Sequence, residues 1–126
     1  MLQRGSKLFW VNKMWKYQKE LEEVFRDYRS DLNQNSYVPR IEISTMCLTV
    51  SSGPDYGILS YKNGTYKLKY RYEDMRCEYK GEEEYKSEEE AILNWMRSFC
   101  FDGFPEDSIT RNRFNEFKSK MCELCK

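Results

Sequence analysis

The sequence predicts an α+β fold, with a long N-terminal helix, a four-stranded antiparallel sheet and two C-terminal helices packed on one sheet face. Apolar residues recur at steps of three and four near both ends of the chain, as in amphipathic helices, and at steps of two in the middle, as in strands. The 126 residues show no linker or internal repeat. We therefore expect residues 1–126 to form a single α+β domain.

The first helix is predicted from about Asn12 to Leu32, because one side of this segment is apolar and the other side is charged. The polar residues 33–36 end the periodicity, and Pro39 favours an extended backbone at Val38. The apolar side, which we expect to be buried, comprises Met14, Tyr17, Leu21, Val24, Phe25, Tyr28 and Leu32.

The first two strands are predicted in residues 40–50 and 56–61. The apolar alternation of the first changes phase, which indicates a bulge near Ser44 or Thr45. A turn cluster at residues 51–55 separates the two strands. The dipeptide Asn63-Gly64 then predicts a type I′ hairpin turn, because both central positions of that turn need a positive φ.

The third and fourth strands are predicted in residues 66–72 and 75–80. In the third, large apolar residues alternate with Lys67, Lys69 and Arg71, and apolar and charged residues alternate similarly in the fourth. This pattern is typical of an antiparallel meander with one buried and one charged face. It predicts that the tyrosines of these strands face the core.

Two helices are predicted to follow the sheet. A capping box of Ser87 and Glu90 begins the first, and Asp107 or Ser108 caps the second. Their buried stripes are expected to be Ala91, Ile92, Trp95, Met96 and Phe99 in the first, and Phe114, Phe117, Met121 and Leu124 in the second.

The composition excludes several kinds of chemistry. The chain has no His, which removes Ser-His-Asp triads, Cys-His pairs and His-ligated metals, and it has no Gly-rich phosphate loop. We therefore expect no enzyme activity and no cofactor. Its 21 basic and 21 acidic residues give zero net charge, which disfavours nucleic acid as a partner. The longest apolar run near the N-terminus, residues 8–11, is too short for a membrane span or a signal peptide, so we expect a cytoplasmic protein that does not bind membranes.

The five cysteines are predicted to be structural. Cys47, Cys77 and Cys100 fall within apolar patterns and act as small hydrophobic residues in a reducing compartment. Cys122 and Cys125 form a CxxC that ends a helix, whereas a redox CxxC begins one, and no second pair has the spacing of a zinc site. Packing or a frayed terminus is the favoured interpretation.

Charged residues gather in two regions of the sequence. An acidic block lies within residues 82–90. A basic stripe projects from the last two predicted strands and consists of Lys67, Lys69, Arg71, Arg76 and Lys80. Such regions are usually solvated surface, but they also suit a polar docking surface that attracts a charged protein partner. The candidate partner-binding residues are Glu82, Glu83, Glu84, Glu88, Glu89, Lys67, Lys69, Arg71 and Arg76.

Residues 56–99 resemble small bacterial immunity proteins that neutralise polymorphic or contact-dependent toxins. The strand Tyr56-Gly57-Ile58-Leu59-Ser60 leads to a polar hairpin, and a Glu-rich segment opens a helix that carries Trp95. The resemblance implies a cytoplasmic, non-enzymatic inhibitor that binds its cognate toxin domain through charged surfaces. On this interpretation residues 82–84, with Glu88 and Glu89, form the contact surface and mimic phosphates if the toxin is a nuclease.

Two other functions fit the sequence. One is a phage-encoded inhibitor of a bacterial defence system, similar to an anti-CRISPR protein, because such proteins are also small and free of catalytic motifs. The other is a small-molecule-sequestering domain that uses tyrosines with Arg71 or Arg76 in a pocket. A deep aromatic-lined cavity would favour the latter, and the gene neighbourhood would distinguish the first two.

Overall fold

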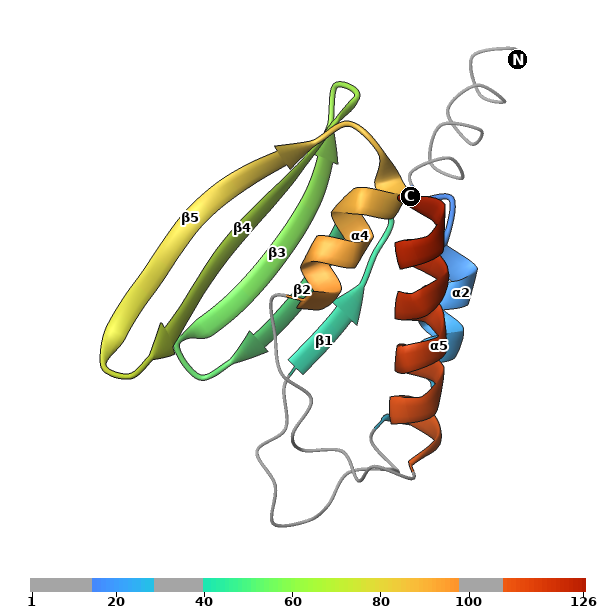
Figure 1. Cartoon of the computed structure of the whole chain (residues 1–126), viewed down its shortest axis with the longest axis horizontal. Helices are drawn as coiled ribbons and strands as arrows, with labels where there is room; N and C mark the ends of the chain where they lie inside the picture. Colours follow the sequence, from blue (N-terminus) through green and yellow to red (C-terminus); the bar gives the residue numbers. More distant parts are fainter. Residues whose placement is uncertain (1–14, 29–39, 98–107) are drawn as a thin grey trace, which may run out of the picture.

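The computed structural model describes residues 15–28, 40–97 and 108–126, and it has the predicted α+β architecture (Figure 1). Its elements, in chain order, are α2 (Gln18–Val24), β1 (Arg40–Ile43), β2 (Cys47–Ser52), β3 (Asp55–Lys62), β4 (Thr65–Asp74), β5 (Cys77–Tyr85), α4 (Glu88–Arg97) and α5 (Ile109–Leu124).

The sheet has five antiparallel strands in chain order, not the four predicted. The segment predicted as one bulged strand is a hairpin of β1 and β2, in which Ile41 pairs with Val50. Ser44 forms its turn: its backbone N–H donates to the carbonyl of Cys47 at 3.0 Å, and its side-chain hydroxyl accepts from the N–H of Cys47 at 3.2 Å. A chain reversal therefore explains the change of phase that was attributed to a bulge.

Two of the hairpin turns have left-handed backbone at both of their central residues. Asn63 and Gly64 have φ of 54° and 81°, which confirms the predicted hairpin turn between β3 and β4. The turn between β4 and β5 consists of Met75 and Arg76, with φ of 49° and 69°. The prediction that Met75 begins the last strand is therefore wrong. That strand starts two residues later and runs to Tyr85, so the Glu-rich segment 82–84 is part of it.

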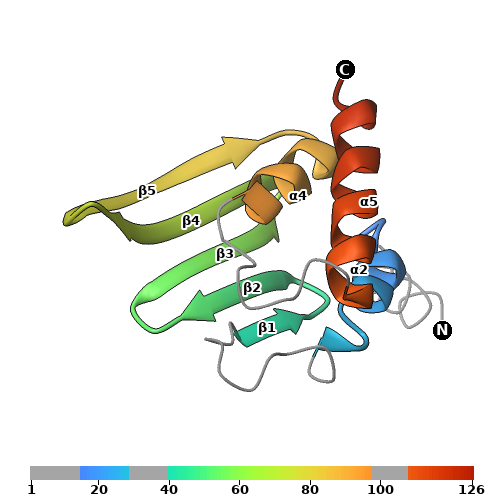
Figure 2. The ribbon, with the colours of Figure 1, turned by 60° about the horizontal axis from the view of Figure 1, so that its bottom comes forward.

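The helices lie on one side and at one end of the sheet (Figure 2). α4 contacts β3, β4 and β5, and α5 packs against α4 and α2. The prediction that both C-terminal helices pack directly on the sheet is therefore wrong for α5. The reason is that α4 lies between α5 and the sheet. On the sheet side, Trp95 Nε1 donates to the carbonyl of Gly57 in β3 at 3.2 Å. Because α4 contacts the sheet and α5, five of its apolar residues are buried.

The N-terminal helix is shorter than predicted, because α2 has seven residues where about twenty were expected. Within residues 15–28 the chain leaves the helix at Phe25, whose ring lies 6.3 Å from the rings of both Trp95 and Phe114. The backbone hydrogen bonds that follow join residues three positions apart, as in a 3₁₀ turn. One of them runs from the N–H of Tyr28 to the carbonyl of Phe25 at 3.3 Å. Residues 12–14 and 29–32 of the predicted helix lie outside the described residues.

The core fills the space between the sheet and the helices. Its fully buried side chains include Leu21 of α2, Leu48 and Leu59 of the sheet, Trp95 of α4 and Met121 of α5. Ser108 caps α5 by accepting from the N–H of Arg111 at 3.1 Å, one of the two predicted caps. Of the predicted stripe residues, Leu124 is half-exposed, and Phe99 lies outside the described residues.

Candidate partner-binding surface

The outer parts of β4 and β5 extend away from the three described helices (Figure 1). We call residues 70–81 the β4–β5 arm. Tyr56 of β3 pairs with Arg71, but the next residues of β4 pair only with β5, so the end of the arm is a two-stranded ribbon. Every residue from 72 to 80 is exposed. The arm is therefore attached to the core at one end and surrounded by solvent at the other.

One side of the arm carries stacked tyrosines. In an antiparallel pair, directly opposed residues share a face, and Tyr72 is opposite Tyr79, with ring centroids 5.1 Å apart and an interplanar angle of 19°. Tyr70 stacks on Tyr72 at 6.1 Å and lies against Gly81, where an added Cβ would come within 2.8 Å of the Tyr70 hydroxyl. We call this side, with Tyr70, Tyr72, Tyr79 and the flanking Asp74 and Glu83, the tyrosine face.

Large apolar side chains on the arm remain uncovered. Tyr72 and Tyr79 are 40% and 45% exposed, and Met75 at the turn is 90% exposed. In the turn between β4 and β5, Met75 and Arg76 both have left-handed backbone. This conformation is rare for residues other than Gly and Asn and often marks a functional segment. The arm thus combines exposed aromatic area with an unusual backbone.

The opposite side of the arm and of the adjoining strands is a charged face. Here Lys67 is the register partner of Glu84 and Lys69 that of Glu82, with ion pairs at 3.9 Å and 3.4 Å. These side chains are half-exposed, so each pair stabilises the fold by less than about 1 kcal/mol. Two lysines of the predicted basic stripe therefore lie beside Glu82 and Glu84 of the acidic block and are neutralised by them.

Arg71 is the most enclosed charge on this face. Its guanidinium, with 12% of the side chain exposed, lies 2.7 Å from Asp55, 2.6 Å from Glu73 and 3.0 Å from Glu78. The hydrogen bonds with Glu73 and Glu78 raise the pKa of Arg71 above its ordinary value. Because these acids come from β3, β4 and β5, Arg71 joins the arm to the rest of the sheet.

Glu88 and Glu89 lie at the start of α4 rather than on the arm, Glu88 buried and Glu89 partly buried. The Glu88 carboxylate is buried and accepts from the backbone N–H of Tyr17 at 2.9 Å and from the Tyr66 hydroxyl at 3.3 Å. Glu89 accepts from Lys16 Nζ at 3.0 Å and from the Tyr17 hydroxyl at 2.8 Å. Its own backbone N–H and the Tyr17 hydroxyl lower the pKa of Glu89. These two acids hold the segment before α2 against the start of α4.

The structure therefore separates the nine predicted contact residues. It brings together Lys67, Lys69, Glu82 and Glu84 on the charged face, with Arg71 beside them. It places Glu83 on the tyrosine face, where it accepts from the Tyr85 hydroxyl, and Arg76 in the turn. Glu88 and Glu89 lie at the start of α4.

The exposed side chains of the arm were missed by the sequence analysis, because the alternation that includes Tyr72 and Tyr79 also predicts burial. Alternation reports which face of the sheet a side chain occupies. It does not report how far along the strand the helices cover that face. The one available sign was the dipeptide Met75-Arg76 between two alternating runs, a position where a tight turn usually has Asn or Gly.

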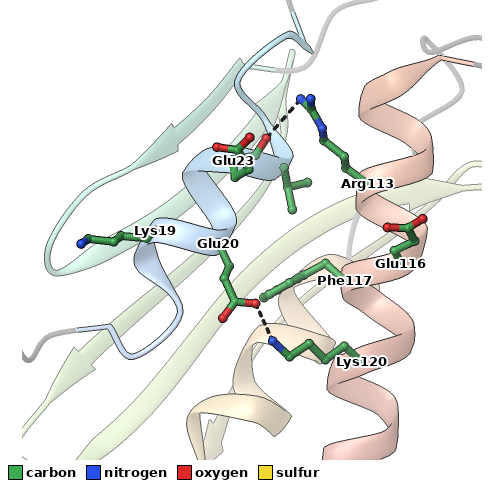
Figure 3. A pocket seen from close by; sticks show the side chains of 8 residues that line it. Lys19, Glu20, Glu23, Arg113, Glu116, Phe117 and Lys120 are labelled. Carbon is green, nitrogen blue, oxygen red and sulfur yellow. Dashed lines mark hydrogen bonds and ion pairs between the residues drawn. The ribbon is translucent and has the colours of Figure 1, made fainter.

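A second surface feature is an open groove of about 460 Å³ between α2 and α5 (Figure 3). Val24 and Phe117 contribute its apolar surface, and charged residues line the rest. Lys120 pairs with Glu20 at 2.6 Å, and Arg113 donates to the Glu23 carbonyl at 3.4 Å. No tyrosine lines this groove, although the small-molecule hypothesis requires tyrosines, and both arginines of that hypothesis lie on the arm.

The described cysteines are free thiols. Cys77 is exposed at the start of β5, so its predicted burial is wrong, while Cys47 is partly buried and Cys100 lies outside the described residues. Cys125, the C-cap of α5, is exposed; partial desolvation, with Glu90 and Glu89 nearby, raises the pKa of its thiol. Within residues 15–28, 40–97 and 108–126, no group of three or more His, Cys, Asp or Glu residues is arranged to hold a metal ion.

Comparison of the chain with protein-family models, curated proteins and solved structures returns no match to any of them. Among the helices described, none is long and apolar enough to cross a membrane.

Proposed function

We propose that this protein is a non-enzymatic inhibitor of the immunity type, which binds and blocks a toxin domain through the tyrosine face and turn of the β4–β5 arm. The observation that carries the proposal is the exposure of Tyr72, Tyr79 and Met75 on a ribbon that extends beyond the core. Tyr, Met and Arg are enriched in protein interfaces, where they become buried on binding.

The geometry of the arm supports this role. An interface needs preorganised side chains, because each side chain that is immobilised on binding costs conformational entropy. The stacking of Tyr72 on Tyr79 restricts both rings before any partner arrives, and Gly81 gives Tyr70 the space to join them. Arg71 fixes the base of the ribbon through three carboxylates.

Of the acidic residues 82–84, Glu83 has a second part in the proposal. All three are exposed in β5 between the arm and the core, but Glu82 and Glu84 lie on the charged face, paired with lysines. If the toxin is a nuclease, the Glu83 carboxylate at the rim of the tyrosine face would face its basic cleft in place of a phosphate. Charges at a rim mainly raise the association rate, whereas the tyrosines would set the lifetime of the complex.

A growth assay tests the proposal. If a toxin domain is encoded immediately upstream of this gene, that domain would be expressed in a bacterial host together with this protein, which should restore growth. The double variant Tyr72→Ser with Tyr79→Ser should fail to restore growth and should bind the toxin domain at least about 30-fold more weakly, as expected for two central aromatic contacts.

The matched control is Lys67→Gln with Glu84→Gln, a register pair on the charged face. It changes two residues, leaves the net charge unchanged and should alter affinity by less than about threefold, because exposed ion pairs contribute little. Absence of growth rescue by the unmodified protein would contradict the immunity function. If the gene instead lies in a phage early operon, the same variants test inhibition of a bacterial defence complex.

A further inference from the structure

The tyrosine face has a charge distribution different from that of the charged face. In the strand register, Asp74 follows Tyr72 on the same face towards the turn, and Glu83 lies on the same face towards the core. Among the described residues Asp74 takes part in no ion pair, and Glu83 accepts only from the Tyr85 hydroxyl. No basic side chain of β4 or β5 belongs to this face. It therefore presents aromatic rings between carboxylates that no cation of the described residues neutralises.

This combination suits one kind of side chain. A guanidinium group stacks on aromatic rings and donates two parallel hydrogen bonds to a carboxylate, and it is more weakly hydrated than an ammonium group. Asp74 is two residues from Tyr72, which corresponds to about 7 Å along a strand. An arginine side chain can therefore lie on the exposed ring and reach the carboxylate at the same time.

We infer that the tyrosine face binds arginine side chains presented by a protein partner, with the guanidinium stacked on Tyr72 or Tyr79 and bonded to Asp74. This inference rests on the proposed function in one respect only, that the arm is the contact surface. It adds the chemistry of the partner: a segment with exposed arginines, for which lysines are a poor replacement.

The test uses the full chain and two synthetic probes, a peptide of alternating arginine and glycine and a peptide in which lysine replaces each arginine. Both peptides carry the same charge. Titrations followed by NMR of the labelled tyrosine rings should show the largest shifts at Tyr72 and Tyr79 with the arginine peptide. That peptide should bind about five- to tenfold more tightly than the lysine peptide.

Two variants sharpen the test. Tyr72→Leu with Tyr79→Leu should remove the preference for arginine, and Asp74→Asn should weaken binding of the arginine peptide. The control Lys69→Gln on the charged face should leave the preference unchanged. Circular dichroism of each variant establishes that it is folded, so that loss of binding is not loss of structure.

Several results would overturn the inference. Equal affinity for the two peptides would show general attraction to positive charge, and shifts confined to other residues would place the site elsewhere. Concentration-dependent dimerisation that is abolished by Arg76→Gln would show that a second copy of this chain occupies the face. The growth assay distinguishes the two proposals: arginine selectivity without growth rescue would contradict the immunity function alone, and growth rescue without arginine selectivity would contradict this inference alone.

Discussion

Apolar and charged side chains alternate along β4, but the helices cover only one end of the strand. Leu68 and Tyr72 lie on the same face of the same strand, yet Leu68 is 2% exposed and Tyr72 is 40% exposed. The helical cover reaches Gly57, which receives the hydrogen bond of Trp95 and is the register partner of Tyr70. Beyond that point the same face meets solvent. Strand periodicity therefore determines which face of the sheet a side chain occupies, whereas the length and placement of the helices determine whether it is buried.

The two regions should therefore divide stability and binding between them. The covered end contains the fully buried side chains, whose removal leaves cavities. The arm ends in a two-stranded ribbon, a structure that is marginal by itself and contributes little to the stability of the whole. Variants at the covered end should consequently lower the free energy of unfolding. Variants on the arm should weaken binding with little effect on stability.

The largest effect is expected for Trp95→Ala. The indole is fully buried, contacts the ring of Phe25 and donates to Gly57, so the variant loses packing and leaves a buried carbonyl without its donor. We expect the free energy of unfolding to fall by about 3–5 kcal/mol in urea denaturation. A loss below about 1 kcal/mol would show that α4 does not anchor the sheet.

Glu88→Ala should give the next largest effect. It removes the acceptor of the buried Tyr17 N–H and of the Tyr66 hydroxyl, and we expect a loss of about 1–3 kcal/mol in the same measurement. The control is Glu84→Ala, an exposed acid of β5, which should change stability by less than about 0.5 kcal/mol. Equal losses in both variants would contradict the separation of these acids into core and surface groups.

The turn of the arm should behave in the opposite way. Met75→Asn with Arg76→Gly introduces residues that accept left-handed backbone, so we expect a gain in stability of about 1–2 kcal/mol. If the turn is part of the contact, the same variant should bind the toxin domain more weakly. A destabilised variant would show that the two side chains have stabilising contacts that outweigh the backbone cost.

The smallest effect concerns alkaline pH. Burial and the neighbouring Glu88 raise the pKa of Tyr66, and burial with Glu83 raises the pKa of Tyr85, both from an ordinary value near 10. A raised pKa means that the folded state retains protons that the unfolded state releases. Their contribution to stability is therefore complete below about pH 10 and is lost as the pH rises above it, by about 1 kcal/mol for each tyrosine at pH 10.5. Tyr66→Phe should reduce this slope in urea titrations, and an unchanged slope would contradict the assignment.

The sequence was sufficient for much of the fold, because its local signals are strong. The Asn63-Gly64 turn, the Ser108 cap and the buried face of α4 all follow from short patterns. The length of α2 was not predictable from periodicity, because Phe25 is held by rings from α4 and α5 that are distant in the sequence. Tertiary packing overrides helical propensity at that point.

The candidate site was less predictable for a related reason. Lys67 and Glu84 are seventeen positions apart, and only the register of β4 with β5 shows that they neutralise each other. Lys67 and Lys69 of one charged region of the sequence thus form a balanced surface with Glu82 and Glu84 of the other. The exposed tyrosines were recognisable only once the extent of the helical cover was known.

Hydroxyl-radical footprinting of the protein, alone and bound to the toxin domain, tests the central claim most directly. We predict that Tyr72, Met75 and Tyr79 are oxidised readily in the free protein, in line with their exposure, and are protected in the complex. Side chains of the groove between α2 and α5 should be oxidised equally in both states. Unchanged oxidation of the arm, with protection of Phe117 in the groove, would contradict the account.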